Sequence, residues 1–350
     1  MKIAIITLPL ISNFGGILQN YALQLALKNL GHEPETIDLD QSPCRIRYAF
    51  RFIRALLTQR SKFVKPDTYH RNPAVTSFLS KNIVLTSRVK CYCCNNDLLN
   101  YDAYIVGSDQ VWRYTNSKYE IYDVYLRFTQ GHNCKRIAYA ISFGVSKWLY
   151  PACVTKKCRT LISNFDAVSV REENAVKLCR ENLGYSPIQV LDPTLLHSKD
   201  VYQNLCLEIP VHKGVLVSYI LDLTDEKKNL VEDIACRLDL SPVYLTEKRS
   251  GGYAVEEWLS YFRDADFVVT DSFHGTVFSI VFEKKFFSIL NSNRGADRFT
   301  SLLKQLGLDN RLLVDYEYES RLGDIDWELV NNRKEIFINY SMNFLSNSLT

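Results

Sequence analysis

The chain has 350 residues, of which 47% are hydrophobic and 23% charged, with a formal net charge of +3 at pH 7. These values are typical of a globular protein large enough for two domains, and the small positive charge gives no indication of nucleic-acid binding. No apolar run approaches transmembrane length, and the first residues enter a strand pattern without a signal peptide, so we expect a cytoplasmic protein.

The first βαβ unit is predicted from a strand at 2–8, a helix at 17–31 and a strand at 36–40. The loop between the first strand and the helix contains Asn13, Gly15 and Gly16, which are candidate substrate-binding residues because such a turn can cradle a phosphate. The alternative is a tight turn that uses two glycines for backbone freedom. The loop is not G-x-G-x-x-G, and no Walker signature occurs, which disfavours a dinucleotide or ATP site.

Segment 44–65 carries seven basic residues and no acidic one, with apolar residues at helical spacing between them. A basic amphipathic helix of this kind can lie on an anionic membrane surface. The alternative is a solvated helix whose apolar side packs on the domain. No recognised nucleic-acid-binding motif accompanies the patch, so we expect no nucleic-acid partner.

Ten cysteines are present, and most stand singly in apolar patterns, where a thiol behaves as a small core residue; examples are Cys179, Cys206 and Cys236. Cys91, Cys93 and Cys94 form a CYCC cluster with one C-x-x-C pair. Because a second pair at zinc spacing and a nearby histidine are both missing, we predict no metal site, and disulfides are not expected in the cytoplasm.

The rest of the first half continues the alternation of strand and helix. A strand at 103–106 ends in a polar loop whose Asp109 and Gln110 are candidate ligands, although Asp109 could equally cap its own loop. A strand at 167–171 reaches Arg171, which can bind an anion or form a surface ion pair. The other expected elements are a strand at 136–144, helices at 151–164 and 172–183, and a last strand within 188–196 that the Asp192–Pro193 step ends.

The second half repeats the pattern. Strands are predicted at 215–221, 243–247, 267–270 and 286–290, and helices at 225–238, 254–264, 297–308 and roughly 324–346. Repeated βα alternation in both halves predicts two doubly wound, Rossmann-like α/β domains that face each other across a cleft. We expect domains at 1–200, on the acceptor side of the shared cleft, and 201–322, with a C-terminal helix at 323–350 that packs back across both.

The organising stretch is DFVVTDSFHGTVFSIVF at 266–282. A buried strand runs through the cap residues Asp271 and Ser272 into a helix, and open α/β sheets bind ligands at such strand ends. His274 lies in the first helical turn, where backbone N–H groups and the helix dipole favour an anion. His274, with the carboxylate of Asp271 three residues upstream, is the leading catalytic candidate; the alternative is a histidine that only caps or packs.

Arginines near the strand ends can bind phosphate or carboxylate, and with His274 they suit a small, doubly charged anion. The candidates are Arg171, Arg294 and Arg298. No nucleophile elbow of the type G-x-S-x-G occurs in the chain.

Four blocks in order resemble the polysaccharide pyruvyltransferase family: NFGGILQNYALQLAL, YDAYIVGSDQVWR, VSVREENAVKLC with VLDPTLL, and DFVVTDSFHGTVFSIVF with NRGADRFTSLLKQLGL. The resemblance covers residues 1 to about 310 and thins in 45–90 and 115–130. It implies a GT-B-like fold and transfer of pyruvate from phosphoenolpyruvate, as co-substrate, onto a sugar as a ketal. It also implies that His274, in S-x-x-H-G, is catalytic and that Arg171 contacts the donor.

The expected function is therefore pyruvyl transfer in cell-surface polysaccharide biosynthesis, such as that of exopolysaccharide or capsule, with no cofactor. The acceptor is expected to be a sugar or a lipid-linked oligosaccharide, and segment 44–65 would place the enzyme at the inner face of the membrane. Two alternatives stay open: a GT-B glycosyltransferase that uses a nucleotide sugar, and a non-catalytic binding or scaffold relative.

Overall fold

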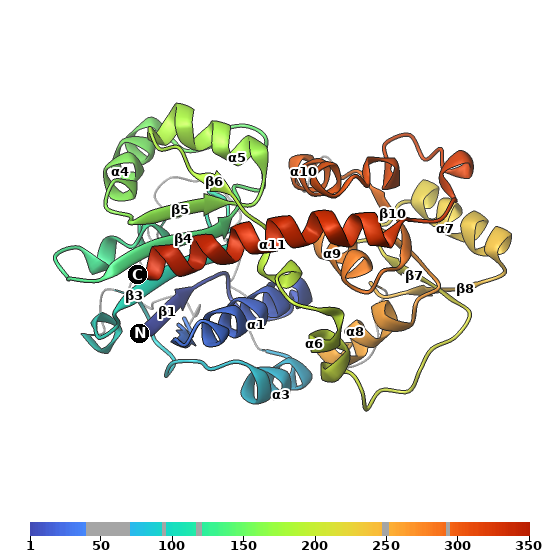
Figure 1. The fold of residues 1–350 in the computed structure, drawn as a ribbon, viewed down its shortest axis with the longest axis horizontal. Helices are drawn as coiled ribbons and strands as arrows, with labels where there is room; N and C mark the ends of the chain where they lie inside the picture. The colour runs from blue at the N-terminus through green and yellow to red at the C-terminus, as the bar shows by residue number, and fades with distance from the viewer. Residues whose placement is uncertain (40–70, 93–95, 117–120, 247–251, 292–294) are drawn as a thin grey trace, which may run out of the picture.

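The computed structural model describes residues 1–39, 71–92, 96–116, 121–246, 252–291 and 295–350. They form two β-sheets, one in each half of the chain (Figure 1). Every strand pairs with its neighbours in parallel. The predicted fold class, two doubly wound α/β domains, is therefore confirmed.

The N-terminal sheet has six strands in the order β2-β1-β3-β4-β5-β6. These are β1 (Lys2–Ile6), β2 (Glu33–Thr36), β3 (Ala103–Asp109), β4 (Lys135–Ile141), β5 (Ala167–Val170) and β6 (Ile188–Gln189). The α-helices described in this half are α1 (Phe14–Asn29), α3 (Pro73–Asn82), α4 (Ala152–Ile162) and α5 (Glu173–Leu178), which continues into a π-helical turn, Cys179–Leu183. Alternate residues of β1 enter two different cores, Ile3 and Ile5 one and Ala4 and Ile6 the other, so both faces of the sheet are covered.

The C-terminal sheet has five strands in the order β11-β10-β9-β7-β8. These are β7 (Val215–Tyr219), β8 (Ser241–Tyr244), β9 (Phe267–Thr270), β10 (Lys285–Ile289) and β11 (Leu312–Leu313). Its helices are α7 (Asp225–Leu238), α8 (Val255–Asp264), α9 (Phe273–Val281) and α10 (Ala296–Leu306). Helix α6 (Lys199–Leu205) lies in the connection between the two sheets.

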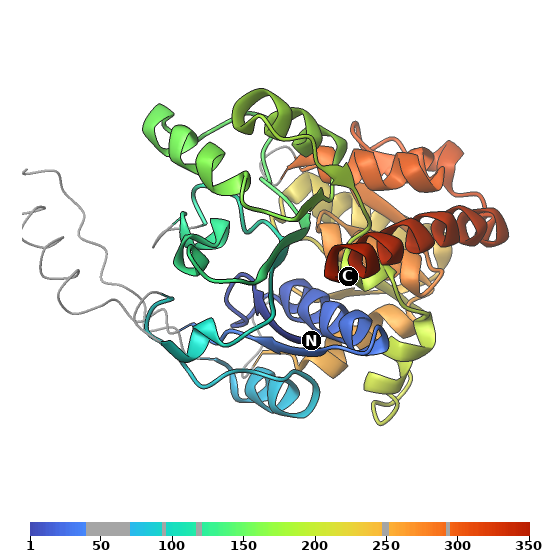
Figure 2. The same ribbon diagram turned by 60° about the vertical axis from the view of Figure 1, so that its left-hand side comes forward.

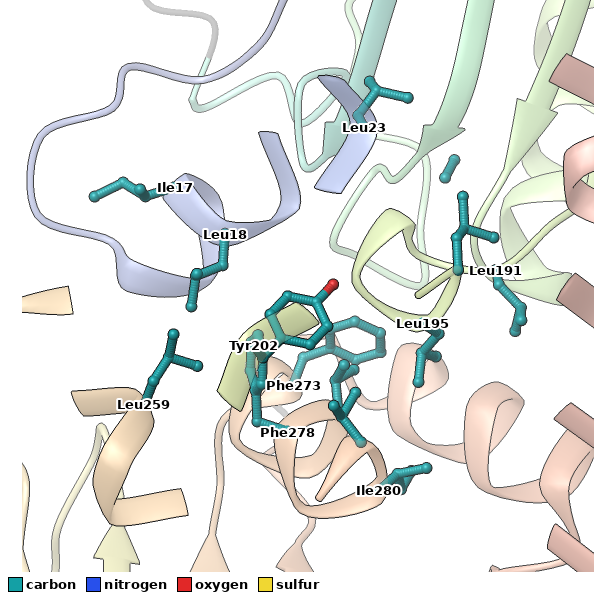
Figure 3. Close-up of a cluster of buried hydrophobic side chains, with 14 of the residues drawn as sticks. Ile17, Leu18, Leu23, Leu191, Leu195, Tyr202, Leu259, Phe273, Phe278 and Ile280 are labelled. Carbon is teal, nitrogen blue, oxygen red and sulfur yellow. The ribbon is translucent and has the colours of Figure 1, made fainter. Parts of the chain in front are cut away.

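One hydrophobic core is shared by both domains. Tyr202 of α6 and Leu195 after β6 lie beside Phe273 and Phe278 of α9, and Leu18 of α1 lies nearby (Figure 3). Leu23 of α1, Leu191 after β6 and Leu259 of α8 belong to the same core. The Tyr202 and Phe278 rings meet edge to face, with centroids 5.2 Å apart. Because this contact is apolar and buried, it holds the two domains together where the β6 end, α1 and α9 meet.

Helix α11 (Trp327–Leu349) runs from the C-terminal domain back to the N-terminal sheet, so both chain termini lie at the N-terminal domain (Figures 1 and 2). Near its start Asn331 donates a hydrogen bond to Glu283, which follows α9. Towards its end the hydroxyl of Ser341 accepts one from the Leu191 amide, and Leu345 is fully buried. The helix therefore contacts both domains.

Three sequence expectations need correction. Helix α1 begins at Phe14 rather than at residue 17, because Asn13 caps it, so Gly15 and Gly16 lie in its first turn and not in a loop. The last strand of the first sheet, expected to end at the Asp192–Pro193 step, is β6 and already ends at Gln189, and a 3-10 turn, Pro193–Leu195, follows that step. Cys179 and Cys206 are buried, but Cys236 is exposed.

The predicted basic helix at 44–65 lies outside the described residues, as do Cys93 and Cys94 of the CYCC cluster. Among the helices that are described, none is both long and apolar enough to cross a bilayer.

Candidate active site

Two helix N-termini, one from each domain, form the centre of the site. Asn13 caps α1 by accepting a hydrogen bond from the Gly16 amide at 3.2 Å, and Ser272 caps α9 by accepting one from the Gly275 amide at 3.4 Å. Neither helix has an acidic residue in its first turn. Because both helices direct the positive ends of their dipoles to this region, it favours a small anion.

Gly15 of α1 approaches the ring of His274 directly. A Cβ atom on Gly15 would overlap His274, with Nδ1 as the nearest atom. Any larger residue at position 15 would have to move either the ring or the helix. The domains are thus in contact at the predicted catalytic histidine, which lies in the first turn of α9 and is only 6% exposed.

Asp192 lies on the opposite edge of the His274 ring. Its Oδ2 is 3.7 Å from Nε2 of His274, and that nitrogen is buried with no hydrogen-bond partner among the described residues. Burial opposes the charged form of Asp192, but the adjacent His274 and Arg171 outweigh it, so the pKa of this carboxyl is held below its ordinary value.

Arg171 immediately follows β5, and its side chain is 2% exposed, so the surface-ion-pair interpretation is wrong. It donates to Oδ2 of Asp192 at 2.5 Å and to Oδ1 of Asp109 at 2.9 Å, and its guanidinium lies 4.2 Å from the centre of the Phe273 ring. Burial disfavours the charged guanidinium, but the two carboxylates more than compensate, and the pKa of Arg171 is raised. The cation is firmly fixed at the interface.

Arg298 of α10 approaches the same group from the C-terminal domain. Its Nη1 is 3.7 Å from Oδ1 of Asp109, and its guanidinium lies 5.4 Å from the Phe273 ring centre. Burial, reinforced by repulsion from Arg171, lowers the pKa of Arg298 to about 10. A negatively charged ligand beside this cation would therefore be stabilised.

Strand β3 extends to Asp109 rather than ending at residue 106 as predicted, so Asp109 is the last strand residue and Gln110 follows it. Burial opposes ionisation of Asp109, but Arg171, His274 and Arg298 outweigh it, and the pKa of Asp109 is lowered. Gln110 instead accepts a hydrogen bond from Arg113 at 2.8 Å and lies against Gly144, at the end of β4. The predicted Asp109 therefore joins the site, whereas the described contacts of Gln110 are with Arg113 and Gly144.

Glu172 is a site residue that the sequence analysis did not select. It is 3% exposed, and its Oε1 accepts a hydrogen bond from Ser142 at 2.7 Å. Burial raises the pKa of this carboxyl, although Arg171 and Arg298 act in the opposite direction. Its position directly after Arg171, at the end of β5, is the sequence feature that could have indicated this residue.

The predicted role of Asp271 as the carboxylate partner of His274 needs correction. Its carboxylate accepts hydrogen bonds from Lys227 at 2.6 Å, from Asn291 at 3.1 Å and from the amides of Leu221 and Asp222 at 2.6 and 3.3 Å. All of these partners belong to the C-terminal domain, where Asp271 ties β9 to the β7–α7 turn. The carboxylate beside His274 is Asp192 from the other domain, so the predicted pairing of His274 with Asp271 is wrong.

Arg294 lies outside the described residues, so the structure does not place it. Within the described ranges no three histidine, cysteine or carboxylate side chains are grouped in a way that could hold a metal ion. The chemistry available to the described site is that of one imidazole, two guanidinium groups and three buried carboxylates.

A sequence model of one protein family, described as polysaccharide pyruvyl transferase, matches residues 13–293. The match begins at the Asn13 cap and includes all of α9, so it covers both helix N-termini of the site. The comparison with curated proteins finds no match.

Two solved structures share the fold over the whole chain. UDP-GlcNAc 2-epimerase from Neisseria meningitidis, bound to UDP-GlcNAc, has a TM-score of 0.50 at 10% identity, covering 100% of this chain and 99% of that one. UGT89C1 from Arabidopsis thaliana, complexed with UDP, has a TM-score of 0.52 at 9% identity, with 100% of both chains covered. At such identities the likeness shows the fold alone, which is the GT-B-like arrangement of two Rossmann-like domains.

Proposed function

The chain belongs to the polysaccharide pyruvyl transferase family, and on that premise we propose that it moves pyruvate from phosphoenolpyruvate onto hydroxyl groups of a sugar as a cyclic ketal. The observation that carries the proposal is the burial of His274 between the N-termini of α1 and α9, with Arg171 and Arg298 beside it. Phosphoenolpyruvate is a small enol phosphate with two anionic groups, and this arrangement supplies an acid and two cations for it.

In this proposal the two helix N-termini and the two arginines contact different parts of phosphoenolpyruvate. The phosphate lies at the facing helix N-termini, where free backbone N–H groups can donate to it. Arg298, whose pKa is lowered to about 10 by burial, gains most from a nearby anion. Arg171 remains fixed by Asp109 and Asp192 and stabilises charge that develops during transfer.

His274 is the general acid. Its protonated ring gives a proton to the methylene carbon of phosphoenolpyruvate, which becomes the methyl group and leaves the central carbon electrophilic. A sugar hydroxyl then forms a C–O bond to that carbon and returns its proton to His274. The C–O bond to phosphate breaks, a second hydroxyl closes the ketal, and its proton leaves with inorganic phosphate.

Access to the site requires movement in this scheme. Since His274 is 6% exposed and Gly15 contacts it, donor and acceptor enter when the domains or adjoining loops separate. Closure then excludes water from the reactive enol.

We assign the acceptor to the sugars of cell-surface polysaccharide biosynthesis, either free or lipid-linked, and the reaction to the cytoplasm. The seven basic residues of 44–65 would favour a lipid-linked acceptor at an anionic membrane face.

Release of inorganic phosphate from phosphoenolpyruvate, measured with and without sugar acceptors, tests the activity. His274→Ala should lower the acceptor-dependent rate by a factor of roughly 100 to 10,000, as expected for loss of a general acid. His132→Ala, at an exposed histidine, is the matched control and should retain activity. Near-normal turnover by His274→Ala would contradict the proposed role.

A glycosyltransferase that uses a nucleotide sugar is the competing enzyme class, because the fold serves both. The β7–α7 turn of the C-terminal domain is acidic: Asp222 lies beside Asp271, and Asp225 and Glu226 open α7. This charge disfavours a nucleotide phosphate there. Phosphoenolpyruvate should therefore raise the melting temperature and UDP-sugars should not; the reverse result would favour the glycosyltransferase. Stabilisation without any turnover would favour a non-catalytic relative.

A further inference from the structure

The local fold holds the Asp192 carboxylate in one orientation. Oδ1 accepts hydrogen bonds from the Thr194 amide at 3.1 Å and from the Thr194 hydroxyl at 2.6 Å, which closes the turn after β6. Both bonds use the same oxygen, so Oδ2 is directed to the domain interface. There it is shared between Arg171 at 2.5 Å and Nε2 of His274 at 3.7 Å. The side chain of Asp192 is fully buried.

The His274 ring lies between two groups of the opposite domain. Nδ1 faces the backbone of Gly15 in the first turn of α1, and Nε2 faces Asp192. Nε2 is a buried polar atom with no hydrogen-bond partner among the described residues, and such atoms are unfavourable unless a partner is within reach. A contraction of less than about 1 Å would give a charge-assisted hydrogen bond of ordinary length to Oδ2.

We propose that Asp192 is a positioning residue for the pyruvyl transfer: it holds Nε2–H of His274 across the domain interface, so that Nδ1 carries the proton delivered to the substrate. The inference rests on the proposed function, and it adds Asp192 as a residue that acts through the general acid His274. The proton on Nδ1 then points to the N-terminus of α1, where the anionic donor lies in the scheme above. The pair also links catalysis to closure, because the two residues belong to different domains.

Other charged groups surround the ring, and they do not replace Asp192. Asp109, at the end of β3, acts on His274 through space, but its Oδ1 is already held 2.9 Å from Arg171 and 3.7 Å from Arg298. Asp192 is therefore the carboxylate whose removal should most disfavour the imidazolium.

The test compares the pH dependence of kcat for the wild-type enzyme and Asp192→Asn, with phosphoenolpyruvate and a sugar acceptor that supports turnover. Activity needs the protonated ring, so kcat falls on the alkaline side. Loss of the carboxylate charge should move this alkaline limb to lower pH, by about 1 or more on the pH scale. It should lower kcat about 10- to 100-fold, whereas KM for phosphoenolpyruvate stays unchanged or falls because Arg171 has lost one of its carboxylates.

Thr194→Val is the matched control. It removes the 2.6 Å hydrogen bond from the same turn but leaves the carboxylate charge in place. The alkaline limb should stay at the wild-type position even if the melting temperature falls. A shift as large as that of Asp192→Asn would show that turn geometry is responsible, and would overturn the positioning role.

A second measurement needs no variant at position 192. In ¹⁵N-histidine-labelled wild-type protein, the His274 signals, identified among the six histidines by their loss in His274→Ala, should show the neutral ring protonated at Nε2. Protonation at Nδ1 would overturn the inference. If His274→Ala is inactive but Asp192→Asn keeps the wild-type pH profile, only the positioning role fails; if His274→Ala is fully active, the proposed function itself fails.

Discussion

The absence of a side chain at Gly15 allows the His274 ring to lie against the first turn of α1. The ring of His274 occupies the volume that a Cβ at position 15 would need. Glycine is unfavourable in a helix by roughly 0.5–1 kcal/mol relative to alanine, so its place in the first turn of α1 is explained by close approach and not by helix formation.

Gly15→Ala should therefore lower kcat on the order of tenfold to a hundredfold, because the ring or α1 must shift by a distance that catalysis does not tolerate. The same overlap should cost about 1–3 kcal/mol of stability, partly offset by the better helix propensity of alanine. Steady-state phosphate release and thermal melting measure the two effects.

Gly323→Ala is the control, because a Cβ there meets no atom within 4 Å. It should leave both kcat and melting temperature near their wild-type values. An enzyme with Gly15→Ala that is fully active and more stable would show that the helix and the ring are not in functional contact.

Titration of Glu172 should make the free energy of unfolding depend on pH, and the direction of this dependence can be predicted. Burial raises its pKa above the ordinary 4.5, so the folded state binds more protons than the unfolded state between the two values. The free energy of unfolding contributed by this group therefore falls as pH rises through that window. A tenfold difference in proton affinity between the two states corresponds to about 1.4 kcal/mol.

Glu172→Gln keeps an acceptor for Ser142 and removes this titration. The variant should gain stability relative to the wild type between pH 4.5 and 8, as measured by urea unfolding at several pH values. Glu181→Gln, at a residue whose side chain is 56% exposed, is the control for loss of one charge and should show a much smaller change. An equal stability difference at pH 4.5 and pH 8 would contradict the assignment.

At the scale of elements, α11 is a long helix whose buried residues are few. Val330, Ser341, Leu345, Ser348 and Leu349 are buried, and the remainder of its surface is partly or fully exposed. Partly buried residues such as Trp327 and Phe337 also pack against the shared core, and in the C-terminal half Ser341 and Leu345 lie against the N-terminal domain.

Leu345→Ala should destabilise the protein by about 2–5 kcal/mol, because it leaves a cavity in the shared core. Ile336→Ala is the matched control on the same helix, since Ile336 is 68% exposed, and it should change stability by less than about 0.5 kcal/mol. Chemical denaturation gives both values. Equal effects would mean that the end of α11 does not carry the interdomain contact.

At the scale of the whole molecule, the two sheets are not independent units. Buried residues of β1 and α1 belong to the same hydrophobic cluster as those of β7, α8 and α9. A buried ion network adds to it, with Asp109, Arg171 and Asp192 from one domain and Arg298 from the other. Separation of the domains would expose both the apolar and the charged part of the interface.

We therefore expect one cooperative unfolding transition for both domains. Circular dichroism and tryptophan fluorescence should give the same urea midpoint, and hydrogen exchange should show β3 and β9 opening together. Trp112 reports on the N-terminal domain and Trp258 on the interface. Two resolved transitions would indicate that the domains unfold separately and that the shared core is weak.

The sequence by itself determined the fold class, and it indicated His274, Asp109, Arg171 and Arg298 as candidate residues, which the structure brings together at the domain interface. Hydrophobic periodicity depends on local geometry, so strands such as Phe267–Thr270 and helices such as Asp225–Leu238 could be read from the chain, as could the place of His274 in a first helical turn. The sequence places the start of α1 at residue 17 instead of Phe14, because two glycines in the first turn give that turn a low intrinsic helix propensity.

Only the tertiary structure decided which groups meet. Asp271 is three residues from His274, yet its carboxylate is held by Lys227 and Asn291 within its own domain, whereas Asp192, 82 positions away along the chain, lies 3.7 Å from the ring. The physical reason is that the charge partners of a residue at a domain interface are set by packing of apolar surfaces far from it in sequence. Periodicity indicates which side of an element is buried and carries no information about what is buried against it.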